Sequence, residues 1–162
     1  MELNISLDEY RIKPNGVIHI GSDKGQMASY YHSQGVHKVM WIDKDFMKYR
    51  ELYQTSAAFA MEQLYYTADL GFTNDKMTFK NLWREYSVQI DIETYDLLCL
   101  DISADSCLAV LNGFEDFLKP IQNILIRPDA DSLVESKLAE EGFVKIVQTD
   151  TVIIYEGQKV AV

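Results

Sequence analysis

The chain has 162 residues, and its 25 acidic side chains outnumber its 15 basic ones, which gives a formal net charge of −10. This balance argues against a nucleic-acid partner, because affinity for phosphate backbones comes from clustered Lys and Arg. It also disfavours an anionic membrane surface, and no apolar run approaches the roughly 20 residues that a membrane-spanning helix needs.

Hydrophobic residues make up 48% of the sequence, and no proline-rich or glycine-rich linker divides it, so we expect one domain that spans residues 1–162. The N-terminal stretch MELNISLDEY is acidic, whereas a signal peptide begins basic and continues apolar. We therefore expect a cytoplasmic protein in which Cys99 and Cys107 are buried, reduced thiols. The sequence does not indicate the oligomeric state.

Five short apolar runs, rich in Val, Ile and Leu, recur along the chain. Each is too short for a helix, and continuous apolar runs of this length are typical of strands buried on both faces of a sheet. The five predicted strands are Val17 to Ile20, Val39 to Ile42, Leu64 to Thr67, Leu97 to Ile102 and Ile121 to Ile126.

Between these runs, apolar residues recur at intervals of three and four, which predicts helices with one buried face. The chain therefore alternates strand and helix, a pattern that favours a parallel sheet covered by helices on both faces. The three helical sets are Phe46, Tyr49, Leu52 and Tyr53; Phe79, Leu82, Trp83 and Tyr86; and Cys107, Leu111, Phe114 and Leu118.

The C-terminal part breaks this alternation. Two strand-like runs, Phe143 to Gln148 and Thr151 to Tyr155, are separated by only two residues. Parallel neighbours need a crossover of a dozen residues or more, so these two strands should form an antiparallel hairpin.

The stretch VIHIGSDKGQ leaves the first predicted strand through a loop that contains Gly21 and Gly25, and a helix begins near Gln26. In open parallel sheets ligands bind beyond the carboxyl ends of the strands, at the point where the strand order reverses. Glycine allows the backbone to approach a ligand closely, and a helix start offers unpaired N–H groups. A tight turn without a ligand is the alternative interpretation.

The loop does not match the dinucleotide signature G-x-G-x-x-G, because Asp23 stands where the second glycine belongs. Its carboxylate would also repel a phosphate. Asp43 ends the second strand, close to the roughly 20-residue offset at which an acid binds ribose hydroxyls. A ligand with a ribose and no phosphate fits both features, and S-adenosylmethionine is such a ligand.

The runs GVIHIGSDKGQ and GVHKVMWIDKD resemble the first cofactor motif and the second-strand acid of FkbM-type class I methyltransferases. The later segments YDLLCLDISADSCLAVLNGFEDFL and EEGFVKI are similar to that family's second block. The resemblance implies a Rossmann-like three-layer αβα sandwich with a mostly parallel seven-stranded sheet. It also implies S-adenosylmethionine as the methyl donor and a hydroxyl acceptor on a sugar or another small molecule.

Residue by residue, the resemblance implies the donor site. Asp43 matches the ribose acid, Asp69 stands where related enzymes hold the adenine amino group, and Asp101 matches the aspartate after the fourth strand. The matching glycine loop and the helix start that follows it comprise Gly21, Ser22, Asp23, Gly25 and Gln26.

The sequence also departs from the family. His19 stands where the family has an aspartate, and the segment Asp101 to Ser106 lacks the glycine and the glutamate of the motif D-x-x-G-A-E. For an acceptor hydroxyl, the first candidate proton acceptor is Asp101 and the second is His19, whose ordinary pKa lies near neutral pH. We expect no metal site, because the other two histidines have no matching acids nearby in sequence.

Two other functions remain open from the sequence. The departures around Ser103 to Ser106 are also typical of a methyltransferase-like fold that has lost catalysis and serves as a binding or assembly module. A nicotinamide-dependent oxidoreductase would use the same loop and Asp43, but it leaves Asp23 and the terminal hairpin unexplained.

Overall fold

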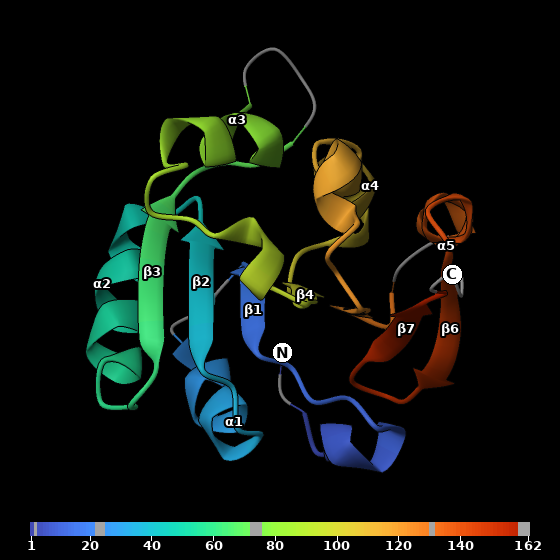
Figure 1. Ribbon diagram of the computed structural model, residues 1–162, viewed down its shortest axis with the longest axis horizontal. Helices are drawn as coiled ribbons and strands as arrows, with labels where there is room; N and C mark the ends of the chain where they lie inside the picture. The colour runs from blue at the N-terminus through green and yellow to red at the C-terminus, as the bar shows by residue number, and fades with distance from the viewer. Residues whose placement is uncertain (2, 22–24, 72–75, 130–131, 159–162) are drawn as a thin grey trace.

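A computed structural model describes residues 1, 3–21, 25–71, 76–129 and 132–158 of the chain. Seven strands form one sheet in the order β3-β2-β1-β4-β5-β7-β6 (Figure 1). This confirms the predicted seven-stranded sheet. The strands are β1 (Gly16–Ile20), β2 (Lys38–Asp43), β3 (Glu62–Thr67), β4 (Leu97–Leu100), β5 (Asn123–Ile126), β6 (Phe143–Gln148) and β7 (Ile153–Gly157).

The first five strands pair in parallel, and only β7 runs against them. Strand β7 pairs antiparallel with both β5 and β6, so β7 lies between these two strands and β6 forms the edge of the sheet. The predicted αβα fold with an antiparallel C-terminal hairpin is therefore confirmed.

Successive residues of the central strands point to opposite faces of the sheet, and both faces are covered. On one face Ile18, Met40 and Leu98 belong to one buried cluster, and on the other Val17 and Val39 belong to a second. Burial on both faces explains why these strands read as continuous apolar runs.

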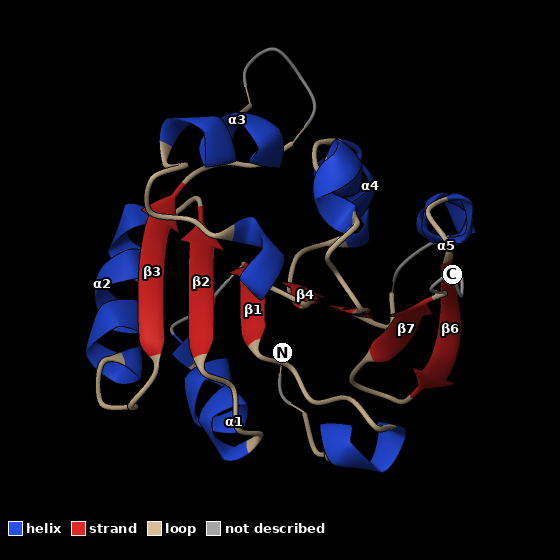
Figure 2. Ribbon diagram, viewed as in Figure 1, coloured by secondary structure: helices blue, strands red, loops and turns tan. Residues whose placement is uncertain are grey.

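The helices form the two outer layers of the sandwich (Figure 2). Residues of α1, α2 and η1 pack in one buried cluster, and residues of α3, α4, η4 and α5 pack in the other. Their bounds are η1 (Leu7–Tyr10), α1 (Met27–Ser33), α2 (Phe46–Ser56), α3 (Phe79–Glu85), η3 (Ile92–Thr94), α4 (Ala104–Asn112), η4 (Glu115–Leu118) and α5 (Ser132–Glu140).

One predicted helix is shorter than its apolar spacing indicates. The periodic set that reaches Leu118 predicts a single helix, but α4 ends at Asn112 and the 3-10 turn η4 follows. Glu115 has a φ angle of 49°, which a right-handed helix cannot contain. Leu118 is nevertheless buried with α4 residues, so the spacing indicated the correct face.

The order of the strands reverses at β1. The chain moves outward from β1 to β2 and β3, and then returns to place β4 on the other side of β1. Such a switch point opens a crevice at the carboxyl ends of the strands.

Cys99 and Cys107 are free and buried, as predicted. No helix in the described ranges is long and apolar enough to cross a membrane.

Candidate functional site

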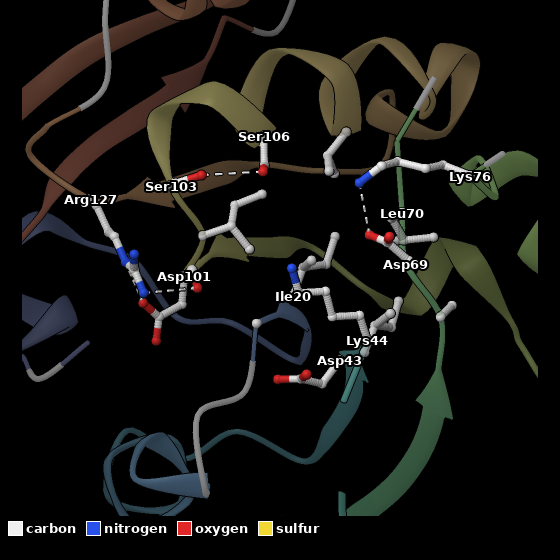
Figure 3. A pocket seen from close by; sticks show the side chains of 15 residues that line it. Ile20, Asp43, Lys44, Asp69, Leu70, Lys76, Asp101, Ser103, Ser106 and Arg127 are labelled. Carbon is white, nitrogen blue, oxygen red and sulfur yellow. Dashed lines mark hydrogen bonds and ion pairs between the residues drawn. The ribbon is translucent and has the colours of Figure 1, made fainter. Parts of the chain in front are cut away.

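A cavity of about 340 Å³ lies at the carboxyl edge of the sheet, where the order of the strands reverses. Gly21, Asp43, Asp69 and Asp101 line it, and each follows or ends one of the strands β1 to β4. Arg127, which follows β5, lines it as well (Figure 3). The cavity thus joins residues that are far apart in sequence, at the place where such folds bind ligands.

Backbone hydrogen bonds extend the sheet beyond the strand ends and fix these residues. The N–H of Gly21 donates to the carbonyl oxygen of Ile42 at 2.8 Å, and the N–H of Asp101 donates to that of Ile20 at 2.9 Å. The N–H of Ala68 donates to the carbonyl oxygen of Asp43 at 2.9 Å. The floor of the cavity is therefore part of the hydrogen-bonded sheet.

The residues predicted to bind a donor divide into three groups. Gly21, Asp43 and Asp69 line the cavity together. Gly25 is buried and Gln26 is exposed where α1 begins, and neither lines the cavity. The predictions for Ser22 and Asp23 lie outside the described residues.

The two carboxylates nearest the ends of β2 and β3 differ in exposure. Asp43 is 8% exposed, and its Oδ1 accepts a hydrogen bond from the N–H of Asp45 at 2.8 Å. The side chain of Asp69 is 50% exposed, and Lys76 Nζ lies 3.1 Å from its Oδ1. Asp43 is therefore almost buried and is bonded to the backbone that follows it. Asp69 is half-exposed and forms an ion pair with Lys76.

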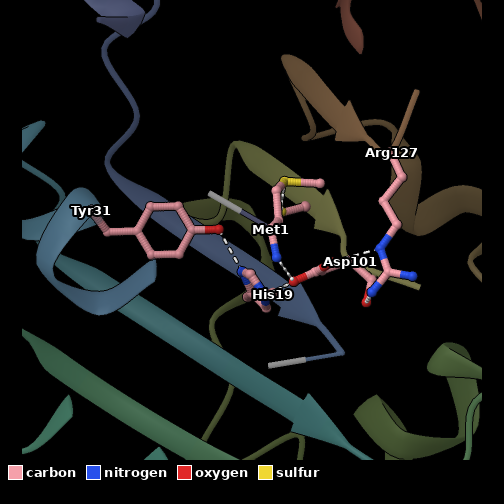
Figure 4. A network of polar contacts seen from close by, with 6 residues as sticks. Met1, His19, Tyr31, Asp101 and Arg127 are labelled. Atoms are coloured by element: carbon pink, nitrogen blue, oxygen red, sulfur yellow. Dashed lines mark hydrogen bonds and ion pairs between the residues drawn. The ribbon is translucent and has the colours of Figure 1, made fainter. Parts of the chain in front are cut away.

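Asp101 is the centre of a buried polar network (Figure 4). Its Oδ1 accepts a hydrogen bond from Arg127 Nε at 2.8 Å, and its Oδ2 lies 2.8 Å from the amino group of Met1. Burial raises the pKa of the carboxyl, but Met1, His19 and Arg127 together lower that pKa below its ordinary value. Asp101 is therefore a carboxylate at neutral pH and a weak proton acceptor.

His19 is fully buried on β1 and does not line the cavity. Its Nδ1 is 2.5 Å from the hydroxyl of Tyr31, and its ring packs against Trp41. Nε2 has no hydrogen-bond partner among the described residues and lies 3.9 Å from Asp101 Oδ2. Burial lowers the pKa of His19 to about 4, although Asp101 opposes this shift, so the ring is neutral at neutral pH. Its contact with Asp101 is then no ion pair.

Sequence reasoning missed several polar residues of the cavity. Arg127 lines it beside Asp101, and the hydroxyls of Ser103 and Ser106, 3.2 Å apart, line it where α4 begins. Lys44 and Lys76 line it near the two other acids. Arg127 could have been found, because it follows a predicted strand at the same edge as Asp101.

In the part of the chain that the structure describes, no group of three or more His, Cys, Asp or Glu side chains could hold a metal ion.

No protein-family model matches the sequence, and no curated protein matches it significantly. Solved structures do match its fold. A putative tRNA (m1A22) methyltransferase of Streptococcus pneumoniae aligns over 99% of this chain and 73% of its own, with 9% identity and a TM-score of 0.67. TrmK of M. capricolum, solved with S-adenosyl-homocysteine, aligns over 97% and 70%, with 11% identity and a TM-score of 0.61.

A third structure belongs to a protein with a different acceptor. The ribosomal protein L11 methylase of Lactobacillus delbrueckii subsp. bulgaricus aligns over 95% of this chain and 75% of its own, with 15% identity and a TM-score of 0.62. At these identities the likeness shows the fold alone, which this chain shares with these three methyltransferases.

These matches conflict with the exclusion of nucleic acid that we based on net charge. The Streptococcus pneumoniae protein is described as a putative tRNA methyltransferase, so the same fold serves a protein with a nucleic-acid acceptor. Net charge is an average over the whole surface, whereas binding depends on the local field at a site. The exclusion therefore does not hold.

Proposed function

We propose that the chain is an S-adenosylmethionine-dependent methyltransferase that binds its donor in the cavity at the carboxyl edge of the sheet. S-Adenosylmethionine would supply the methyl group, and its transfer to an acceptor oxygen would leave S-adenosylhomocysteine and a proton. The observation that carries the proposal is that Gly21 and Asp43 line one cavity at the point where the strand order reverses.

Each donor-site residue has a proposed role. Gly21 allows the backbone to lie close to the ligand, the carboxylate of Asp43 accepts hydrogen bonds from the ribose hydroxyls, and Asp69 accepts one from the adenine amino group. The other positions of the glycine loop and of the helix start are proposed as donor contacts from the resemblance alone, namely Ser22, Asp23, Gly25 and Gln26.

The resemblance to FkbM-type enzymes supports a hydroxyl acceptor on a small molecule or a sugar. Of the two predicted proton acceptors, only Asp101 lines the cavity, and its lowered pKa makes it a weak base. His19 is enclosed by Tyr31 and Trp41 and has no exposed surface. We therefore propose Asp101 as a fixed negative charge of the site and assign no proton transfer to His19.

The Asp43→Ala variant should bind S-adenosylmethionine and S-adenosylhomocysteine about tenfold to a hundredfold more weakly than the unchanged protein. This is the range expected when a charge-assisted hydrogen-bond acceptor is removed. Isothermal titration calorimetry measures both affinities directly. Asp116→Ala removes a side chain that is 88% exposed on η4, and it serves as the matched control with unchanged affinity.

Binding of neither compound to the unchanged protein would reject the methyltransferase and leave a fold that serves interaction alone. If the donor binds, transfer of a radiolabelled methyl group is measured with sugars and small hydroxyl compounds in one set of assays and with tRNA in another. Labelling of tRNA alone would contradict the small-molecule acceptor while leaving the methyltransferase in place.

A further inference from the structure

His19 stands between a buried tyrosine of α1 and the carboxylate that follows β4. Its Nδ1 lies 2.5 Å from the hydroxyl oxygen of Tyr31, and its Nε2 lies 3.9 Å from Oδ2 of Asp101. Figure 4 shows the three side chains in a row, with the imidazole ring in the middle. His19 and Tyr31 are fully buried, whereas Asp101 lines the cavity. The row therefore leads from the core of the protein to the site.

The two ring nitrogens of His19 have different surroundings. A neutral imidazole carries one N–H, so one nitrogen donates and the other accepts. With the proton on Nδ1, the lone pair of Nε2 would face the carboxylate of Asp101, and Nε2 has no hydrogen-bond partner among the described residues. A buried acceptor beside a negative charge is unfavourable. With the proton on Nε2, the N–H faces that negative charge and Nδ1 accepts from Tyr31.

The hydroxyl of Tyr31 is suited to donate to Nδ1. Burial raises the pKa of Tyr31 well above its ordinary value, so the hydroxyl keeps its proton. The thiol of Cys99 also interacts with this hydroxyl, but sulfur is a weak hydrogen-bond acceptor. The imidazole nitrogen is therefore the stronger acceptor for the hydroxyl proton.

The charges around the ring favour the same position of the ring proton. Burial has the largest effect on the pKa of His19 and keeps the ring neutral. Among the nearby charges, Asp101 raises this pKa more than the amino group of Met1 lowers it, and Asp43 raises it as well. A neutral ring in this field is most stable with its N–H directed at Asp101.

We infer that His19 is a positioning residue of the site. Tyr31 donates its hydroxyl proton to Nδ1 and so fixes the neutral ring as the Nε2–H tautomer, whose N–H faces and holds the carboxylate of Asp101. This role rests on the proposed function, in which Asp101 is a fixed negative charge of the donor site. The tautomer itself does not depend on a ligand.

NMR spectra of protein with ¹⁵N-labelled histidine test the tautomer at pH 7. Protonated and unprotonated ring nitrogens have distinct chemical shifts, so His19 should show a protonated Nε2 and an unprotonated Nδ1. The His19→Gln variant identifies these signals by their loss. His32 and His37 are exposed and supply reference signals in the same spectrum. A proton on Nδ1 of His19 would overturn the inference.

The Tyr31→Phe variant tests how the tautomer is fixed. It keeps the aromatic ring and removes only the hydroxyl, so the Nδ1 signal of His19 should move towards that of a nitrogen that accepts no hydrogen bond. Tyr30→Phe is the matched control, because the hydroxyl of Tyr30 donates to the carbonyl oxygen of Ile5 at 2.9 Å instead. It should leave the Nδ1 signal in place.

Two substitutions of His19 test the contact with Asp101. The side-chain amide of glutamine reaches the place of Nε2 and replaces its N–H, whereas that of asparagine reaches only the place of Nδ1. His19→Asn should bind S-adenosylmethionine about threefold to tenfold more weakly, because the carboxylate that attracts the sulfonium is held less firmly. His19→Gln should bind it within about twofold of the unchanged protein. Calorimetry gives the affinities, and thermal melting verifies that both variants are folded.

The outcomes separate this inference from the proposed function. Equal weakening by His19→Asn and His19→Gln would mean that His19 only supports the structure, and would overturn the inference. An Nδ1 signal that Tyr31→Phe leaves unchanged would overturn it as well. Failure of the unchanged protein to bind any donor would reject the proposed function, while the spectra without ligand would still decide the tautomer of His19.

Discussion

Replacing Gly21 with alanine is expected to lower the free energy of unfolding by about 3–5 kcal/mol. Gly21 has a φ angle of 84°, which an alanine adopts only with strain. A Cβ atom there would collide with the carbonyl oxygen of Asp101 and would lie 2.8 Å from Cγ2 of Ile102. The carbonyl cannot easily retreat, because the N–H of Asp101 is bonded to Ile20 and its oxygen accepts from Arg127.

Urea denaturation of the two proteins measures this difference. Gly35→Ala is the matched control, because Gly35 has a similar φ angle of 79° but no atom within 4 Å of the position that a Cβ would occupy. We expect it to cost about 1–2 kcal/mol from the backbone alone. Equal losses in the two variants would show that close packing of Asp101 on Gly21 contributes nothing.

Acid should destabilise the protein through His19. From about pH 7 to pH 4.5, the free energy of unfolding should fall by about 2 kcal/mol more in the unchanged protein than in His19→Gln. The pKa of His19 is about 4 in the folded protein, against an ordinary value of 6.5. Between these values the unfolded chain binds a proton that the folded chain excludes, so stability falls as the pH falls.

Urea denaturation at a series of pH values measures this difference. Asp101 also makes the protein less stable towards acid, because its folded pKa is lowered. Met1 and Arg127 cause part of that lowering and are present in both proteins, so this part cancels in the comparison. The ring signals of His19 in NMR spectra give a second measurement, since they should not titrate above about pH 5. Parallel stability curves for the two proteins would contradict the burial of a neutral His19.

The sheet could be predicted from the sequence because the pattern that marks it is local. The strands β1, β2, β4 and β5 lie at or within about two residues of the runs that predicted them, since burial on both faces leaves continuous apolar segments. The hairpin of β6 and β7 followed from the short connection between them. The end of α4 was not visible, because the φ angle of Glu115 depends on packing and not on apolar spacing.

The candidate site was predictable only in part, for a related reason. Gly21, Asp43, Asp69 and Asp101 each follow or end a strand, and parallel strands bring their carboxyl ends to one edge. The contact of Arg127 with Asp101 depends on the sheet order, because β5 is the neighbour of β4. Likewise, the enclosure of His19 depends on Tyr31 from α1 and Trp41 from β2.

The central place of β1 also affects how quickly the chain can fold. Its first residue, Gly16, donates its N–H to the side chain of Asp96, 80 residues away, and β1 pairs with β4 along the next residues. Closing so long a loop costs entropy before packing stabilises it, and parallel sheets are slow to form for this reason. Before β4 has paired with it, β1 is an apolar strand at the edge of the sheet. Exposed apolar edge strands are prone to pair with strands of another chain. Refolding at high protein concentration should therefore lose material to aggregation through the segment from β1 to β3.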